Sequence, residues 1–106
     1  ALNTNDGREY LNMDDIIHIE GDVNYSRLFL TEKRVILASK TLKVFEELLS
    51  GHGFYRTHKS SLVNLKHVKR ILSRDGLTIE MSDGSQAVLS RHSKDEFIRL
   101  MDEYSR

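Results

Sequence analysis

The stretch 54–65 places long hydrogen-bond donors and hydroxyl groups beside a short apolar run. Its donors are Arg56, His58 and Lys59, and its hydroxyls include Ser60. Arg and Lys bind guanine acceptors or neutralise phosphate, whereas hydroxyls and backbone amides bind phosphate oxygens. The stretch therefore suits contact with a nucleic acid, provided that its apolar residues hold it in a core.

Two further polar sets have similar chemistry. In the set 90–94 the backbone amides and Ser93 could hold a phosphate at a helix start, while Arg91 reaches a base. In the set 24–27 the leading residue is Asn24, and Asn is the natural bidentate partner of adenine. Taken singly, each set has a simpler interpretation, with Ser93 as a helix cap and Asn24 as a turn residue.

The chain has no net charge, but its charges are unevenly distributed. Its 16 basic and 16 acidic side chains balance within 106 residues. The segment Arg56–Arg74 nevertheless holds six basic residues and no acid, and many of the balancing acids lie within Asp6–Asp22. A basic cluster of this kind is either a phosphate footprint or a solvated surface whose partners are those acids.

No catalytic or metal-binding set is visible. There is no Cys, and the five histidines form neither a His-x-His pair nor an i, i+4 pair. No nucleophile elbow or glycine-rich phosphate loop occurs either. We therefore expect no enzyme, no cofactor and no metal. His18 is predicted to point away from Ile17 and Ile19 and to have a structural role.

The elements that must position these residues are mostly strands. Three Asp-Gly pairs, at 6–7, 75–76 and 83–84, predict tight hairpin turns. The predicted strands are 2–5, 8–11, 16–20, 25–31, 35–38, 68–73, 77–81 and 86–89, with 54–57 as a further candidate.

Two segments, near 41–50 and 94–104, have helical periodicity. Thr41 is the candidate N-cap of the first, and Gly51 follows its end. Ser93 and Glu96 form a capping-box pattern at the second. The expected fold class is mainly β, with antiparallel sheets and two short helices.

The length favours one domain, 1–106, in which residues 1–5 are either the end of an interdomain linker or a first strand. No apolar run is long enough to span a membrane, and no signal peptide is visible. The absence of Cys fits a cytoplasmic protein.

The sequence resembles the LytTR domain, the DNA-binding output module of many bacterial response regulators. The resemblance rests on Asp14–Gly21 with Asn24-Tyr25, on Lys40-Thr41-Leu42, on Gly53–Leu65, and on Asp83-Gly84 with Leu89-Ser90-Arg91. The pattern Phe-x-Arg-x-His-x-Ser-x-x-Val-Asn over residues 54–64, with Ser-Arg at 90–91, is its most specific part.

The resemblance implies an elongated antiparallel β fold whose loops, rather than a recognition helix, enter successive major grooves. The base-reading loops would be 24–27, 56–60 and 90–92. Lys59 stands where relatives often have Arg or Asn, and Ser26 where they often have Val or a longer residue. Those departures leave the preferred DNA sequence open.

On this basis each polar residue receives an expected role. Base contacts are expected from Asn24, Ser26, His58, Lys59, Arg91 and His92. Phosphate contacts are expected from Tyr25, Arg27, Arg56, Ser60, Ser61, Lys66, Lys69, Ser90 and Ser93. Val63 and Leu65 should anchor the central loop in the core, and Asn64 should satisfy backbone groups rather than touch DNA.

The implied partner is double-stranded DNA, with two copies of the domain on direct repeats, and the implied function is transcriptional regulation in a two-component phosphorelay. Family members usually carry an N-terminal receiver domain, which the resemblance places upstream of Ala1 in the parent protein. No membrane partner is expected.

Two other functions compete with this one. A single-stranded RNA-binding module could stack bases on Phe54 and Tyr55 beside Arg56. A protein-interaction or sensory module without catalysis could use histidines that titrate near neutrality.

Overall fold

The computed structural model describes residues 2–4, 7–74 and 76–105. Its elements confirm the expected fold class, because strands predominate and two α-helices lie near the predicted positions. The strands are β1 (Leu2–Thr4), β2 (Gly7–Glu9), β3 (Ile16–Asp22), β4 (Tyr25–Leu30), β5 (Arg34–Ala38), β6 (Phe54–His58), β7 (Ser61–Asn64), β8 (Val68–Leu72), β9 (Thr78–Met81) and β10 (Gln86–Val88). The α-helices are α1 (Leu42–Leu48) and α2 (Lys94–Tyr104), and the short 3₁₀ helices are η1 (Met13–Asp15), η2 (Leu65–His67) and η3 (Arg91–Ser93).

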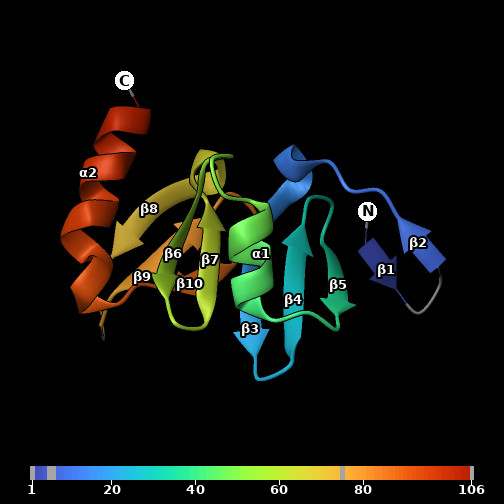
Figure 1. Ribbon diagram of the computed structural model, residues 1–106. Coiled ribbons are helices and arrows are strands. Elements are labelled where there is room, and N and C mark those ends of the chain that lie inside the picture. Colours follow the sequence, from blue (N-terminus) through green and yellow to red (C-terminus); the bar gives the residue numbers. More distant parts are fainter. Residues whose placement is uncertain (1, 5–6, 75, 106) are drawn as a thin grey trace.

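Antiparallel pairing organises the strands into two main sheets and an N-terminal hairpin (Figure 1). The larger sheet has the order β5-β4-β3-β7-β6, the smaller one has the order β10-β9-β8, and β1 pairs with β2. The sequence predicts no strand at β7, because its four residues are all buried and lack the alternation of a half-buried strand. With extents of 39 × 29 × 24 Å the molecule is elongated, as expected.

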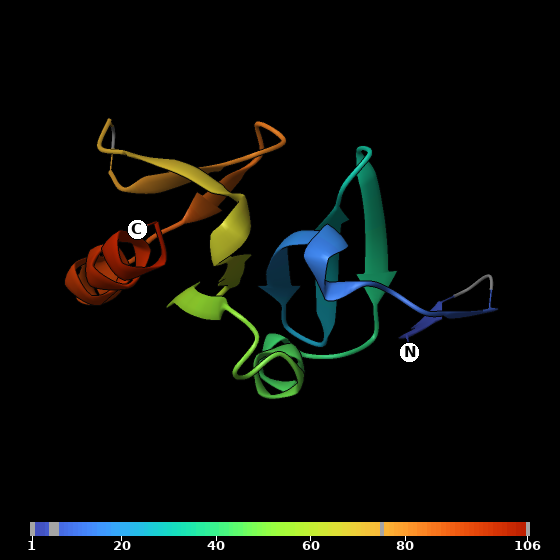
Figure 2. The same ribbon diagram turned by 90° about the horizontal axis from the view of Figure 1, so that it is seen from above.

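The larger sheet is covered on both faces, which creates two hydrophobic clusters. On one face Leu42 and Phe45 of α1 pack with residues of β3, β4 and β5. On the other face the smaller sheet and Phe97 of α2 enclose the second cluster, which also contains Val63 and Leu65 as predicted. Figure 2 shows α1 and the smaller sheet on opposite sides of the larger one.

A bulge in β3 changes the direction in which its side chains point. The pairing with β4 shifts register just before His18, so Ile17 belongs to one hydrophobic cluster and Ile19 to the other. The prediction that His18 points away from both isoleucines is therefore wrong, because it assumed an unbroken alternation. The imidazole is buried, stacks on Phe29 with ring centres 4.3 Å apart and shares a 3.0 Å hydrogen bond with Ser85 Oγ, which confirms its structural role.

The helix starts match the predictions in part. Thr41 Oγ1 accepts a hydrogen bond from an amide of the first turn of α1, as expected of an N-cap. The predicted capping box of α2 does not form. Ser93 N–H donates to Ser90 Oγ, and Glu96 accepts from the Tyr55 hydroxyl instead. No helix in the described residues has the length and apolar content that a membrane crossing requires.

One of the three predicted Asp-Gly turns lies wholly within the described residues. Asp83 Oδ1 accepts a 2.9 Å hydrogen bond from the amide two residues later, and Gly84 has a left-handed φ of +85°. This confirms the β9–β10 turn. Asp6 and Asp75, on which the other two turns depend, lie outside the described residues, as does Asn5 at the end of the first predicted strand.

Candidate nucleic-acid interface

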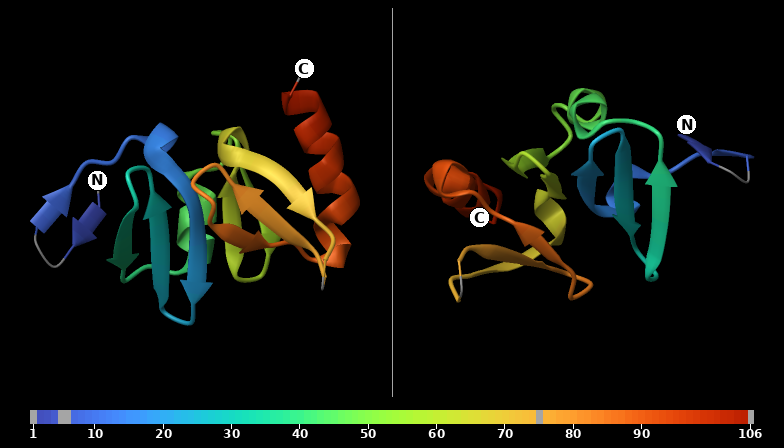
Figure 3. Two further views of the ribbon diagram at one scale, coloured as in Figure 1. Left: turned by 180° about the vertical axis from the view of Figure 1, so that it is seen from behind. Right: turned by 90° about the horizontal axis from the view of Figure 1, so that it is seen from below.

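Three segments that are distant in sequence lie along one edge of the molecule. They are the β3–β4 turn, the β6–β7 turn and the segment 89–93 that leads into α2, and together we call them the loop edge. Gly21 N–H donates to Ser60 O at 2.9 Å and joins the first two, while Ser90 N–H donates to Thr57 O at 2.8 Å and joins the third. The loop edge runs along the bottom of Figure 1 and faces the viewer in the right panel of Figure 3. The three polar sets identified in the sequence therefore meet on one surface.

Four residues predicted to contact bases present free side chains on the loop edge. Asn24, Lys59, Arg91 and His92 are exposed, and within the described part of the chain their side chains have no hydrogen bond or ion pair. Asn24 lies in the first turn, Lys59 in the second, and Arg91 and His92 in η3. Side chains of these types can bind adenine, guanine or phosphate, so the arrangement offers donors from three separate points of one surface.

Arg56 supports the β6–β7 turn from within. Its Nε donates to His58 O at 3.0 Å, and its Nη2 donates to Lys59 O at 2.5 Å. Its Nη1 forms an ion pair of 2.7 Å with Glu46 of α1. Three guanidinium N–H groups are thus held by the turn and by α1, so Arg56 positions the turn. The predicted phosphate contact would have to use the guanidinium N–H groups that remain.

His58 closes the same turn from the other side. Its Nδ1 accepts a 3.1 Å hydrogen bond from Ser60 N–H and lies 2.8 Å from Ser60 Oγ. Because Nδ1 accepts from an amide, we assign the proton of the neutral ring to Nε2. His58 thus retains one donor that could face a partner, and Ser60 remains partly exposed beside it.

Two serines are too deeply buried for the contacts predicted for them. Ser26 is 1% exposed, and its hydroxyl donates to Lys40 O at 2.7 Å, so a base contact by this side chain does not fit the structure. Ser61 is also 1% exposed, so a phosphate contact does not fit it either. Both serines lie in strands that are packed on each side, a property that a one-letter pattern does not reveal.

Five residues predicted to contact phosphate do lie on or beside the loop edge, and they differ in how free they are. Tyr25 and Arg27 are exposed on β4, where Arg27 Nη1 lies 3.3 Å from Glu20 Oε1. Ser60, Ser90 and Ser93 are partly exposed, and the hydroxyl of Ser90 accepts from Ser93 N–H. Their positions are compatible with phosphate contacts.

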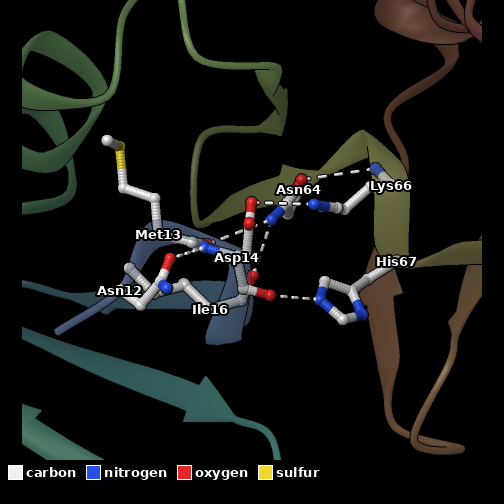
Figure 4. A network of polar contacts seen from close by, with 7 residues as sticks. All are labelled: Asn12, Met13, Asp14, Ile16, Asn64, Lys66 and His67. Carbon is white, nitrogen blue, oxygen red and sulfur yellow. Dashed lines mark hydrogen bonds and ion pairs between the residues drawn. The ribbon is translucent and has the colours of Figure 1, made fainter.

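Asn64 connects η2 to the start of β3 (Figure 4). The start of β3 lies at the end of the larger sheet opposite the loop edge (Figure 1). Its Nδ2 donates to Ile16 O at 2.9 Å and to Met13 O at 3.3 Å, while its Oδ1 accepts from Lys66 N–H at 3.3 Å. This confirms the expectation that Asn64 satisfies backbone groups.

Lys66 belongs to the same network and not to the loop edge. Its Nζ lies 2.7 Å from Asp14 Oδ1, and this hydrogen bond lowers the pKa of the Asp14 carboxyl (Figure 4). Lys69 follows on β8, near η2. Phosphate contacts by these two lysines do not fit a surface at the other end of the sheet. The basic stretch Arg56–Arg74 is thus dispersed over the fold instead of forming one patch.

One neighbour of the loop edge is not among the residues predicted from the sequence. A shallow hollow beside Arg91 is lined by Ser73 and Leu77 from the β8–β9 turn and by Lys94 from α2. Lys94 is exposed and adds a positive charge next to Arg91. The sequence holds one signal for Lys94, because it is the first residue of the predicted helix 94–104 and directly follows the predicted contact residues 90–93.

The aromatic residues that an RNA-binding module would need are engaged elsewhere. Phe54 packs against the cluster beneath α1, and Tyr55 packs on Phe97 with ring centres 5.9 Å apart. The Tyr55 hydroxyl donates to Glu96 at 3.0 Å, and burial raises the pKa of this hydroxyl. Both rings are thus engaged in packing within the protein, which leaves less of them for the base stacking that single-stranded nucleic acid uses. Among the described residues no group of three or more His, Asp or Glu side chains is placed to hold a metal ion.

Comparison with known proteins identifies a family and similar solved structures. The family model described as LytTr DNA-binding domain matches residues 6–102. A solved structure, the LytTr DNA-binding domain of a response regulator from Bacillus cereus, aligns with a TM-score of 0.78 and 25% sequence identity, covering 94% of this chain and 93% of that one. A search among curated proteins finds no relative.

Proposed function

The chain belongs to the family of LytTr DNA-binding domains, and on that premise we propose that it recognises specific sequences in double-stranded DNA through the loop edge. In this proposal the three segments of the loop edge enter the major groove and transcription is regulated as a result. A DNA-binding family of this kind performs no catalysis.

The observation that carries the proposal is the convergence of three donor-bearing segments. Asn24, Lys59 and Arg91 come from separate parts of the sequence, yet all three are exposed along one edge and have no side-chain partner among the residues that the structure describes. Asn suits adenine, and Lys and Arg suit guanine, in the major groove, where each base pair is distinguishable. His58, through Nε2, and His92 are supporting base contacts, and Tyr25, Arg27, Ser60, Ser90 and Ser93 are the proposed phosphate contacts.

The test is in vitro selection of duplexes from a random pool, followed by affinity measurements on the selected site. Arg91→Ala and Lys59→Ala should each weaken binding by about 1–3 kcal/mol and relax discrimination at one base pair. Lys66→Ala is the matched control, because Lys66 is paired with Asp14 away from the loop edge. If both loop-edge variants bind the selected site as the parent does, the proposal is wrong.

Competition by single-stranded RNA of equal length distinguishes the RNA-binding alternative. Displacement of the duplex by such RNA would favour the RNA-binding alternative. Failure of the chain to bind either nucleic acid would favour a protein-interaction module.

We further propose that two copies bind direct repeats and that the parent protein is a cytoplasmic response regulator with an N-terminal receiver domain. The similar domain from Bacillus cereus belongs to a response regulator, which supports this context. Gel-shift titration on duplexes with one or two selected sites tests the first part. A second shifted species should appear on the double site and depend on the spacing between the sites.

A further inference from the structure

Val23 occupies the tip of the β3–β4 turn in an unfavourable backbone conformation. Its φ is +49°, in the left-handed region, and its side chain is 86% exposed. A β-branched side chain is a poor choice at positive φ, where Gly, Asn or Asp normally stand. The residue type at this position therefore opposes the conformation of the turn.

In the described part of the chain, no packing of the Val23 side chain compensates for this conflict. A side chain that is 86% exposed gains little from packing, and Val23 belongs to neither hydrophobic cluster. Its neighbours Asp22 and Asn24 are also exposed. Backbone strain that no packing contact offsets tends to occur at functional positions.

The position of Val23 indicates what its methyl groups could contact. The turn is one of the three segments of the loop edge, and Asn24, a proposed base contact, follows directly. A major groove presents hydrogen-bonding atoms on every base pair, and its apolar feature is the C5-methyl group of thymine. An aliphatic side chain at the tip of a groove-entering turn matches that methyl group.

We propose that Val23 is a specificity-determining residue that recognises thymine by apolar contact with its C5-methyl group. The inference rests on the proposed function and extends it to a residue that hydrogen-bonding chemistry does not identify. Val23 selects thymine over other bases at one position, while Asn24 reads a neighbouring base pair.

Replacement of single thymines by deoxyuridine tests the contact, because it removes only the methyl group. On the selected duplex, one such replacement should weaken binding of the parent about fourfold, the value expected for one buried methyl group. Val23→Asn should bind the thymine and deoxyuridine duplexes equally at that position. Asn tolerates positive φ, so the same variant should also melt at a higher temperature than the parent.

Glu32→Asn is the matched control. Glu32 has a φ of +64° in the β4–β5 turn, at the end of the sheet away from the loop edge, so the change relieves a comparable backbone conflict elsewhere. This variant should retain the fourfold preference for thymine. Val23→Ala, which keeps only one methyl carbon, should show a reduced preference and provides a second test.

Three results would overturn the inference. Parent binding could prove insensitive to deoxyuridine at every thymine, or its sensitivity could persist unchanged in Val23→Asn. A lower melting temperature of Val23→Asn would show that the turn itself requires Val23. A parent that selects a duplex but fails these tests leaves the proposed function intact, whereas a parent that selects none overturns both.

Discussion

His18 lies between the two sheets with its ring stacked on Phe29, and its Nδ1 has no hydrogen-bond partner among the described residues. Burial lowers the pKa of this imidazole, so the folded protein favours the neutral ring. In the unfolded chain the same group takes up a proton near pH 6.5. Folding therefore opposes protonation of His18.

The consequence is a fall in stability below about pH 6.5. There the unfolded state binds more protons than the folded state, so the free energy of unfolding decreases as the pH falls, by at most about 1.4 kcal/mol per pH unit for one group. Urea unfolding between pH 7.5 and 5.5 should show this decrease in the parent. His18→Phe keeps the stacked ring and should flatten the dependence. His52→Gln, at an exposed site, should retain it. An equal slope in parent and His18→Phe would contradict the assignment.

For single residues, the sequence predicts which side chains have the chemistry to contact DNA better than it predicts which of them are exposed. Asn24 and Ser26 are two positions apart and both are predicted base contacts, yet Asn24 lies in the exposed β3–β4 turn, whereas Ser26 is buried in β4 and donates to Lys40 O just before α1. Arg56 was assigned to phosphate because its type suits phosphate, but three hydrogen-bonding partners inside the protein hold it. Such partners come from tertiary packing and leave no local pattern.

The β6–β7 turn depends on a helix that lies outside the loop edge. Glu46 of α1 binds Arg56, and Arg56 in turn holds the carbonyls of His58 and Lys59. The orientation of Lys59 is therefore coupled to α1 through one guanidinium. Preorganised side chains bind better because less conformational freedom is lost on association.

Arg56→Ala should accordingly weaken binding to the selected duplex about tenfold without removing a DNA contact, and Glu46→Gln should reproduce part of this loss, about threefold. Glu47→Gln is the control, since Glu47 is exposed on the same helix and has no ion pair within the described residues. Discrimination between bases at the base pair that Lys59 contacts should fall most in Arg56→Ala, less in Glu46→Gln and not in Glu47→Gln. A full effect of Arg56→Ala with none of Glu46→Gln would indicate a direct phosphate contact by Arg56 instead.

Among elements, the sequence predicts those with a clear period and misses those buried on both faces. The two α-helices and most strands follow from periodicity and turn residues, within one or two residues at their ends. All four residues of Ser61–Asn64 are buried, so the segment shows no alternation of polar and apolar residues. The sequence therefore indicates an apolar anchor at β7 and not a strand. The 3₁₀ turn η3 likewise replaces the predicted cap of α2, because Ser90 supplies the hydroxyl expected from Ser93.

Across the whole molecule, ion pairing decides how much of the positive charge can reach a partner. Within the described chain, Arg27, Arg34, Arg56, Lys66, Arg70 and Arg99 are each paired with an acidic side chain. Among the exposed cations outside these ion pairs, Lys59 and Arg91 lie on the loop edge and Lys94 lies beside it. The dense basic stretch of the sequence thus contributes one free cation, Lys59, to the loop edge.

This distribution predicts a shallow salt dependence of DNA binding. Each neutralised phosphate contributes about −0.9 to the slope of log K against log salt, so the three free cations give a slope of about −3 for one domain on one site. Arg27 is left out of this count because Glu20 already balances its charge. Six contacts from the whole basic stretch would instead give a slope steeper than about −5. Titrations of a single-site duplex between about 50 and 200 mM salt measure the slope. Lys59→Ala should reduce its magnitude by about one and Lys66→Ala should leave it unchanged, whereas a reduction by Lys66→Ala would place DNA at both ends of the sheet.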